Sequence, residues 1–143
     1  MIYIGSDHGG FELKNVIVEN LKEKGFEVCD CGTFTKDSVD YPNVAKDVCE
    51  KVAGSDEKGI LVCGTGVGMS MAANKVNGIR AVVASDAFSV RMSRVHNNAN
   101  VLCLGQRVLG NALALMLVDE FLKSEFEGGR HKRRIELITA MEG

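Results

Sequence analysis

Short apolar runs alternate with longer amphipathic stretches along the whole chain. An uninterrupted apolar run is typical of a strand buried on both faces of a sheet, whereas apolar residues spaced three and four apart indicate a helix with one buried face. The apolar runs predict strands over residues 1–6, 26–31, 59–64, 80–85 and 100–105. The amphipathic stretches predict helices between Gly10 and Gly25, from Pro42 to Gly54, from the glycines at 64–68 onwards, from Asp86 to about His96, over 109–122 and over 131–141.

This alternation of strands and helices, without internal repeats, predicts an α/β fold with a parallel sheet. Right-handed crossovers favour a three-layer, Rossmann-like arrangement, in which helices cover both faces of a five-stranded sheet with the flavodoxin-like order 2-1-3-4-5. A chain of 143 residues has the length of one domain, so we expect residues 1–143 to form a single domain. Ligands of such sheets bind at the carboxyl ends of the strands, beside the switch point between the first and third strands.

Composition narrows the possible partners and the compartment. The net charge of -2 argues against a general nucleic-acid surface, and the basic run at residues 130–134 suits a small anion better than a duplex. The chain has no long apolar run and no basic-then-apolar N-terminus, so we expect no membrane span and no secretory signal. Five cysteines, an odd number, are typical of free thiols in a reducing compartment, and we expect a cytoplasmic protein.

The cysteines outside position 63 are expected to be structural. Cys29 and Cys31 are two positions apart in a predicted strand, so their side chains share one side of the sheet. No neighbouring Cys-x-x-Cys or histidine pair completes a tetrahedral ligand set, so we expect no metal site there. Cys49 and Cys103 lie in apolar patterns and are expected to be small core residues.

A glycine-rich turn follows the most apolar predicted strand, with Cys63 directly before it. Backbone N–H groups at such a turn, together with the dipole of the next helix, can hold an anion and favour the thiolate form of a neighbouring cysteine. The turn is neither a dinucleotide fingerprint nor a P-loop, because the required glycine or lysine positions are missing. Glycines that only permit a tight strand-to-helix connection are the alternative explanation. The residues of the turn are Gly64, Thr65, Gly66, Val67 and Gly68.

Further polar residues lie at predicted connections between strands and helices. Each has an ordinary structural explanation: an Asx turn, a histidine satisfied by a helix end, or a solvated arginine face. We nevertheless expect the thiol, a carboxylate, two histidines and the turn amides to converge on one edge of the sheet, with arginines as anion ligands. The candidates beyond the glycine turn are Asp7, His8, His96, Asn97, Arg107, Arg130 and Arg134.

This combination of groups suits proton transfer next to a carbonyl in a phosphorylated substrate. Removal of a proton alpha to a carbonyl places negative charge on oxygen, which the turn amides can stabilise while a thiolate accepts and returns the proton. Arginines would hold the phosphate as a fixed handle. Such a reaction needs no hydride cofactor, and the chain has no cofactor motif.

Several motifs closely resemble those of the ribose-5-phosphate isomerase type B family, which also includes the galactose-6-phosphate isomerase subunits. They are SDHGG at residues 6–10, DYP at 40–42, CGTGVG at 63–68, NK-x-x-GIRA at 74–81, HN-x-x-NVL-x-LG-x-R at 96–107 and EGGRH at 127–131. The resemblance implies interconversion of D-ribose 5-phosphate and D-ribulose 5-phosphate, a step of the pentose phosphate pathway. It further implies an enediolate intermediate, no metal or cofactor, and a homodimer or dimer of dimers.

The resemblance also implies a role for each candidate residue. Cys63 would be the base that moves a proton between C1 and C2, assisted by Thr65, and residues 64–68 would bind the developing enediolate. Some members of the family lack the cysteine and use a carboxylate a few residues later. Residues 69–74 contain no Asp or Glu, so this chain fits the thiol version.

By the same resemblance, the remaining candidates hold the sugar and its phosphate. His96 would open the furanose ring as an acid, with Asp7 and Asn97 placed around the sugar. His8, Arg107, Arg130 and Arg134 would hold the phosphate or neighbouring hydroxyls. Because the site of this family lies between subunits, we expect some groups, the late arginines above all, to come from a partner chain.

Two other functions stay open at this point. One is a hexose-phosphate isomerase acting on galactose 6-phosphate or allose 6-phosphate, since one extra carbon changes contacts worth only about 1 to 3 kcal/mol. The other is a non-catalytic sugar-phosphate sensor, or a subunit that needs a different partner. A complete set of site residues in one chain argues against this second alternative, whereas the size of the pocket decides the first.

Overall fold

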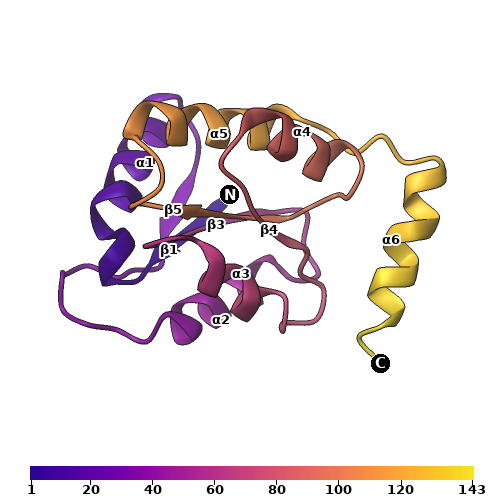
Figure 1. Cartoon of the computed structure of the whole chain (residues 1–143), viewed down its shortest axis with the longest axis horizontal. Helices are drawn as coiled ribbons and strands as arrows, with labels where there is room; N and C mark the ends of the chain where they lie inside the picture. The colour runs from indigo at the N-terminus through magenta and orange to yellow at the C-terminus, as the bar shows by residue number, and fades with distance from the viewer.

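The computed structural model describes all residues, 1–143, and forms three layers with a parallel sheet in the middle (Figure 1). The strands are β1 (Ile2–Ser6), β2 (Val28–Asp30), β3 (Lys58–Cys63), β4 (Ala81–Val83) and β5 (Val101–Gly105). Every neighbouring pair of strands is parallel. The α/β fold predicted from the sequence, with helices on both faces of a five-stranded sheet, is confirmed.

The predicted strand order is wrong for the last two strands. The sheet has the order β2-β1-β3-β5-β4, so β5 lies beside β3 and β4 forms the edge. Every residue of β5 is buried, whereas the three residues of β4 are half-buried or exposed. An uninterrupted apolar strand gains most from the doubly covered middle of the sheet, and a short, partly exposed strand suits the edge.

The helices divide between the two faces of the sheet (Figure 1). Those on one face are α1 (Phe11–Glu23), α4 (Ala87–Val95) and α5 (Asn111–Lys123), and those on the other are α2 (Tyr41–Val52) and α3 (Val67–Ala73). A short 3-10 helix, η1 (His8–Gly10), precedes α1. Each face has its own apolar core, and Cys49 and Cys103 are fully buried in the core under α2 and α3, as predicted. None of the helices combines the length and apolar character needed to cross a membrane.

Helix boundaries follow the expected local signals. Pro42 lies in the first turn of α2, where its missing N–H is no loss. The Asp86 carboxylate caps α4 by accepting a hydrogen bond from the Ser89 N–H at 2.8 Å. Gly25 follows α1 with φ of +87°, a left-handed conformation that glycine adopts without steric penalty.

The last helix, α6 (Arg130–Ala140), stands apart from the three layers (Figure 1). Ile135, Ile138 and Met141 follow one another at a spacing of three residues and so share one apolar side of this helix. Only Ile135 is buried, whereas Ile138 is 49% exposed and Met141 is 85% exposed. The helix therefore has an apolar side but packs little of it against its own chain.

Candidate active site

The carboxyl ends of β1, β3 and β5 bring one group of candidates together, and we call this side of the sheet the carboxyl edge. β1 pairs with β3 up to Ser6 and Val62, and β3 pairs with β5 up to Cys63 and Gly105, so the three strands end side by side. The loops that follow these strands also touch. A Cβ placed on Gly9 would lie 3.4 Å from the Gly64 nitrogen. This edge carries Asp7, His8, the turn at 64–68 and Arg107.

Cys63 lies at the centre of the carboxyl edge, with its side chain almost fully buried. Its Sγ accepts a hydrogen bond from the Gly66 N–H at 3.0 Å. Such a bond is stronger to a thiolate than to a thiol, because the acceptor then carries a charge. The next N–H of the turn, that of Val67, is donated to Thr65 Oγ1 at 3.3 Å. Two amides of the turn therefore already donate hydrogen bonds to the side chains of Cys63 and Thr65.

Arg107 is fixed beside the turn by the backbone. The Gln106 N–H donates to the Cys63 carbonyl at 2.9 Å, and the Arg107 N–H donates to the Gly64 carbonyl at 3.0 Å. A Cβ on Gly64 would lie 3.6 Å from Arg107 Cδ, so the arginine side chain runs along the glycine. Arg107 is exposed, so its guanidinium group is a solvent-accessible cation beside the turn that follows the buried Cys63.

Asp7 and His8 each accept a backbone hydrogen bond through their side chains at the carboxyl edge. The Asp7 side chain is largely buried, and its Oδ1 accepts a hydrogen bond from the Gly10 N–H at 3.1 Å, as the Asx-turn explanation predicts. His8 is exposed, and its Nδ1 accepts from the Val39 N–H at 3.3 Å. That bond ties the loop between β2 and α2 to the carboxyl edge. Asp7 Oδ1 therefore holds the backbone at Gly10 in place. The loop that carries Asp7 and His8 lies beside the turn at 64–68.

The expectation that both histidines share one edge of the sheet is wrong. His96 is the C-terminal cap of α4, and the exposed Asn97 follows it. A crossover helix runs antiparallel to the strands it connects, so the end of α4 lies at the amino ends of the strands. Figure 1 shows α6, which carries Arg130 and Arg134, at the opposite end of the molecule from the loop between β5 and α5. One chain therefore divides the predicted site between two edges.

At this second place, the amino edge, His96 meets a histidine that was not among the predicted site residues. The rings of His96 and His131 are stacked, with centroids 4.2 Å apart and planes inclined by 16°. His131 is buried, and its Nε2 has no hydrogen-bond partner. Burial, together with the charges of nearby arginines and of His96, lowers the pKa of His131. The sequence signal for this residue was its place in the EGGRH motif.

Ligand atoms of His96, Glu127 and His131 lie within 4.8 Å of one another. A metal ion needs lone pairs that converge on one point, and these lie in the plane of each imidazole. Because the two rings are nearly parallel, their lone pairs cannot converge while the stack is intact. A metal ion would therefore compete with the stacked arrangement.

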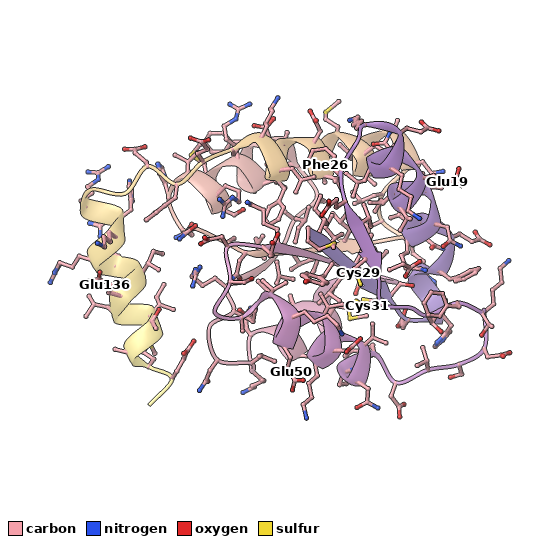
Figure 2. The ribbon with its side chains drawn as sticks, turned by 180° about the vertical axis from the view of Figure 1, so that it is seen from behind. Glu19, Phe26, Cys29, Cys31, Glu50 and Glu136 are labelled. Atoms are coloured by element: carbon pink, nitrogen blue, oxygen red, sulfur yellow. The ribbon has the colours of Figure 1, made fainter.

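The Cys29 and Cys31 thiols lie side by side, as predicted (Figure 2). Their sulfur atoms are 3.9 Å apart, and they are not part of any cluster of three potential metal ligands. Burial and the neighbouring Cys29 raise the pKa of Cys31 to about 12, which keeps this thiol protonated at neutral pH. All five cysteines are free.

Tyr41 is a further residue at the carboxyl edge that sequence reasoning left out. It begins α2, is 39% exposed, and a Cβ on Gly68 would lie 2.8 Å from its ring. Its ring therefore covers the last glycine of the turn. The signal for it was the DYP motif.

Comparison with known proteins gives matches over nearly the whole chain. The chain is 54% identical to ribose-5-phosphate isomerase B of Escherichia coli, over 99% of this chain and 95% of the relative. The structure matches that of ribose-5-phosphate isomerase B from Clostridium thermocellum with a TM-score of 0.96 and 54% identity, covering 99% of this chain and 96% of the other.

Two further findings concern a bound ligand and the family. A structure of ribose-5-phosphate isomerase B from Mycoplasma genitalium with bound ribulose-5-phosphate matches with a TM-score of 0.95 and 49% identity, covering 99% of this chain and 95% of the other. The sequence model of the Ribose/Galactose Isomerase family matches residues 2–138. The chain therefore belongs to the ribose/galactose isomerase family.

Proposed function

We propose that this protein is an isomerase that interconverts D-ribose 5-phosphate and D-ribulose 5-phosphate by proton transfer through an enediolate. The observation that carries the proposal is the Cys63 thiol at the carboxyl edge, bonded to the Gly66 N–H and placed beside the loops of Asp7 and Arg107. The relative from Mycoplasma genitalium, whose structure contains bound ribulose-5-phosphate, supports the choice of substrate.

The proton transfer uses Cys63 as base and acid in turn. Its thiolate removes the proton from C2 of the open-chain aldose, and the electrons move onto the C1 oxygen to give the enediolate. Free amides of the 64–68 turn stabilise the negative oxygen. The C2 hydroxyl loses its proton as the C1 oxygen gains one, assisted by the Thr65 hydroxyl. The Cys63 thiol then returns its proton to C1, which leaves the ketose.

The ring-opening step uses His96, which lies on the other edge of the same chain. We propose that two copies assemble so that His96, Asn97, Arg130 and Arg134 of one copy face the carboxyl edge of the other. His96 then protonates the ring oxygen, and the arginines hold the phosphate together with His8 and Arg107. The apolar side chains that α6 leaves exposed support such an assembly, as a homodimer or a dimer of dimers.

The organisation and location of the protein follow from the same proposal. Residues 1–143 form a single sugar-phosphate isomerase domain, and the chemistry requires only the sugar phosphate and the protein's own side chains. Five free thiols fit a reducing compartment, and we place the enzyme in the cytoplasm.

The test is direct. The purified protein is incubated with ribose 5-phosphate and EDTA in deuterated water, and NMR follows formation of ribulose 5-phosphate and deuterium incorporation. We expect turnover in EDTA for the wild type and for Cys29→Ser, a control thiol away from the carboxyl edge. Cys63→Ala should fold normally and lose nearly all activity. Absence of turnover in the wild type would refute the proposed function, and an active Cys63→Ala enzyme would refute the assigned base.

Galactose 6-phosphate and allose 6-phosphate are the second set of substrates to assay, because the matching family includes galactose isomerases. We expect kcat/KM for the five-carbon phosphate to exceed that for either hexose phosphate. The difference expected for one extra carbon is about 10- to 200-fold. A higher kcat/KM on a hexose phosphate would assign the protein to the hexose branch of the family.

A further inference from the structure

The stack of His96 and His131 is formed by two elements that are not neighbours in the sequence. His96 caps the end of α4, and His131 lies in the first turn of α6. The centroid separation of 4.2 Å and the inclination of 16° place one ring flat on the other. Rotation of the His96 side chain about χ2 would drive its ring edge into His131. The stack therefore restricts the directions in which the nitrogen atoms of His96 can point.

The segment that leads to His131 is fixed to the end of α4 by one backbone and one side-chain hydrogen bond. The Glu127 N–H donates to the Val95 carbonyl at 3.0 Å, and Arg94 Nε donates to the Ser124 carbonyl at 3.3 Å. The His131 N–H donates to the Gly128 carbonyl at 3.1 Å. These bonds hold the second ring in place although the rest of α6 packs little against its own chain. His131 is thus a firm support for the His96 ring.

The polar atoms around His131 do not explain its burial. Its Nε2 lacks a hydrogen-bond partner, and the nearest carboxylate oxygen, Glu127 Oε1, is 4.0 Å away. Burying an unpaired polar group is unfavourable, so a ring at this place needs a compensating role. The stack on His96 supplies such a role.

We infer that His131 is a positioning residue whose ring holds the His96 imidazole in the orientation that opens the furanose ring. This inference rests on the proposed function, in which His96 is the ring-opening acid. It separates two steps of one reaction: His131 acts on ring opening through His96, whereas proton transfer between C1 and C2 depends on Cys63 at the carboxyl edge.

The charges around His96 and His131 agree with a supporting role for His131. The groups that face His131 are His96, Glu127, Arg130 and Arg134. Burial lowers the pKa of His131, and His96, Arg130 and Arg134 lower it further while Glu127 opposes them. A lowered pKa disfavours the positively charged form of His131, so the ring beneath His96 repels a protonated His96 less than an ordinary histidine would.

The two substrates of the reaction allow ring opening to be measured apart from proton transfer. Ribose 5-phosphate closes into a furanose and must be opened. Ribulose 5-phosphate carries its phosphate on O5, so no free hydroxyl can close a five-membered ring on C2, and the molecule is open-chain. Deuterium exchange at C1 of ribulose 5-phosphate in deuterated water therefore requires Cys63 and no ring opening.

The experiment compares His131→Ala, which removes the ring, with His131→Phe, which keeps a flat ring and removes both ring nitrogens, the unpaired Nε2 included. We expect His131→Ala to lower kcat for ribose 5-phosphate by about 10- to 100-fold, as displaced catalytic groups do, and to leave exchange into ribulose 5-phosphate within about 2-fold of wild type. His131→Phe should restore ribose 5-phosphate turnover to within about 3-fold of wild type. Circular dichroism and Tm are measured for each variant.

Three results would overturn the inference: unchanged ribose 5-phosphate turnover in His131→Ala, an equal loss of both activities, or a His131→Phe enzyme as slow as His131→Ala. The variant His96→Asn separates this outcome from failure of the proposed function. If His96→Asn turns over ribose 5-phosphate normally, the ring-opening role of His96 is wrong. If His96→Asn is slow and His131→Ala is not, only the role of His131 is wrong.

Discussion

At the scale of single residues, Gly66 is the position where backbone shape and chemistry depend on each other most directly. Its φ is +81°, and its N–H is the donor to Cys63 Sγ. A Cβ at this position would lie 2.9 Å from Val83 Cγ2 and 3.0 Å from the Leu104 carbonyl carbon, a backbone atom that cannot move aside easily. A side chain at Gly66 would therefore displace the amide that faces the thiol.

We expect Gly66→Ala to lower kcat for ribose 5-phosphate by about 100-fold or more and to destabilise the protein by about 2–4 kcal/mol. Gly25→Ala is the matched control, because Gly25 also has a positive φ but no atoms lie within 4 Å of its Cβ position. The control should cost about 1 kcal/mol and keep full activity. Steady-state kinetics and urea unfolding measure both effects. If both variants lose the same activity and stability, the positive φ rather than the crowded Cβ position accounts for the loss.

The buried thiols predict a pH dependence of stability. Burial raises the pKa of Cys49 from its ordinary value near 9 to about 12, so the folded protein holds this thiol protonated where the unfolded chain ionises. The stabilising contribution is complete below about pH 9 and is lost as the pH rises toward 12. We expect the urea midpoint to fall between pH 8 and pH 10.5, and to fall less in Cys49→Ala. An identical slope in the variant would contradict this assignment.

At the scale of elements, one buried ion pair connects α1 to the edge strand β2. Lys14 Nζ lies 2.7 Å from Asp30 Oδ2, and the lysine side chain is only 1% exposed. The other oxygen of Asp30 accepts the Gly32 N–H at 2.9 Å. The pair therefore fixes the start of the loop that leads to the carboxyl edge, as well as the docking of α1.

Removing one charge of this pair should destabilise the fold. We expect Asp30→Asn, which keeps an acceptor for Gly32, to cost about 3 kcal/mol by leaving the buried Lys14 charge without a partner. Adding Lys14→Met should recover most of that loss, since the double variant buries no charge. Urea unfolding of the two single variants and the double variant gives the coupling between them. Additive losses would mean that the ion pair contributes nothing of its own.

Local sequence signals predicted most elements, because helix starts and ends depend on neighbouring residues such as Pro42 and Asp86. The burial of Lys14 could not be predicted in this way, since it depends on a partner in another element. The sequence does contain a signal for the order of β4 and β5: β5 is the more continuous apolar run, which favours the middle of the sheet. Helix direction likewise contained the signal that His96 lies on the amino edge.

The same reasoning separates the predictable and unpredictable parts of the site. Cys63, Asp7 and Arg107 come together because each lies at or just after the carboxyl end of a central strand, which the alternation of elements already implies. The stack of His96 on His131 depends on how the segment before α6 packs against α4. No periodicity in the sequence reports such a contact between a helix end and a distant helix start.

At the scale of the whole molecule, the two halves of the site lie on opposite edges of one chain. The twofold assembly proposed above would place the carboxyl edge of each copy against the amino edge of the other and so form two equivalent sites. In such an assembly each site takes Cys63 from one copy and His96 from the other. A site made within one chain would instead require both residues from the same copy.

Mixed assemblies distinguish these two arrangements. Cys63→Ala and His96→Asn are each expected to be nearly inactive on ribose 5-phosphate. In a mixed dimer with shared sites, one site carries both substitutions, and the other takes Cys63 from the His96→Asn chain and His96 from the Cys63→Ala chain. Random reassortment makes half of the dimers mixed, so about a quarter of wild-type activity should return after mixing and subunit exchange.

The mixing experiment has internal controls. Each variant is passed through the same exchange procedure alone, and mass spectrometry of the intact assembly measures the fraction of mixed dimers. Activity should rise in proportion to that fraction, with the KM of the wild type, because the restored site contains no substitution. If mixed dimers form and activity stays at the level of the single variants, Cys63 and His96 act within one chain. In that case α6 and the end of α4 would have to move toward the carboxyl edge of the same chain, so that His96 reaches the site of Cys63 without a second copy.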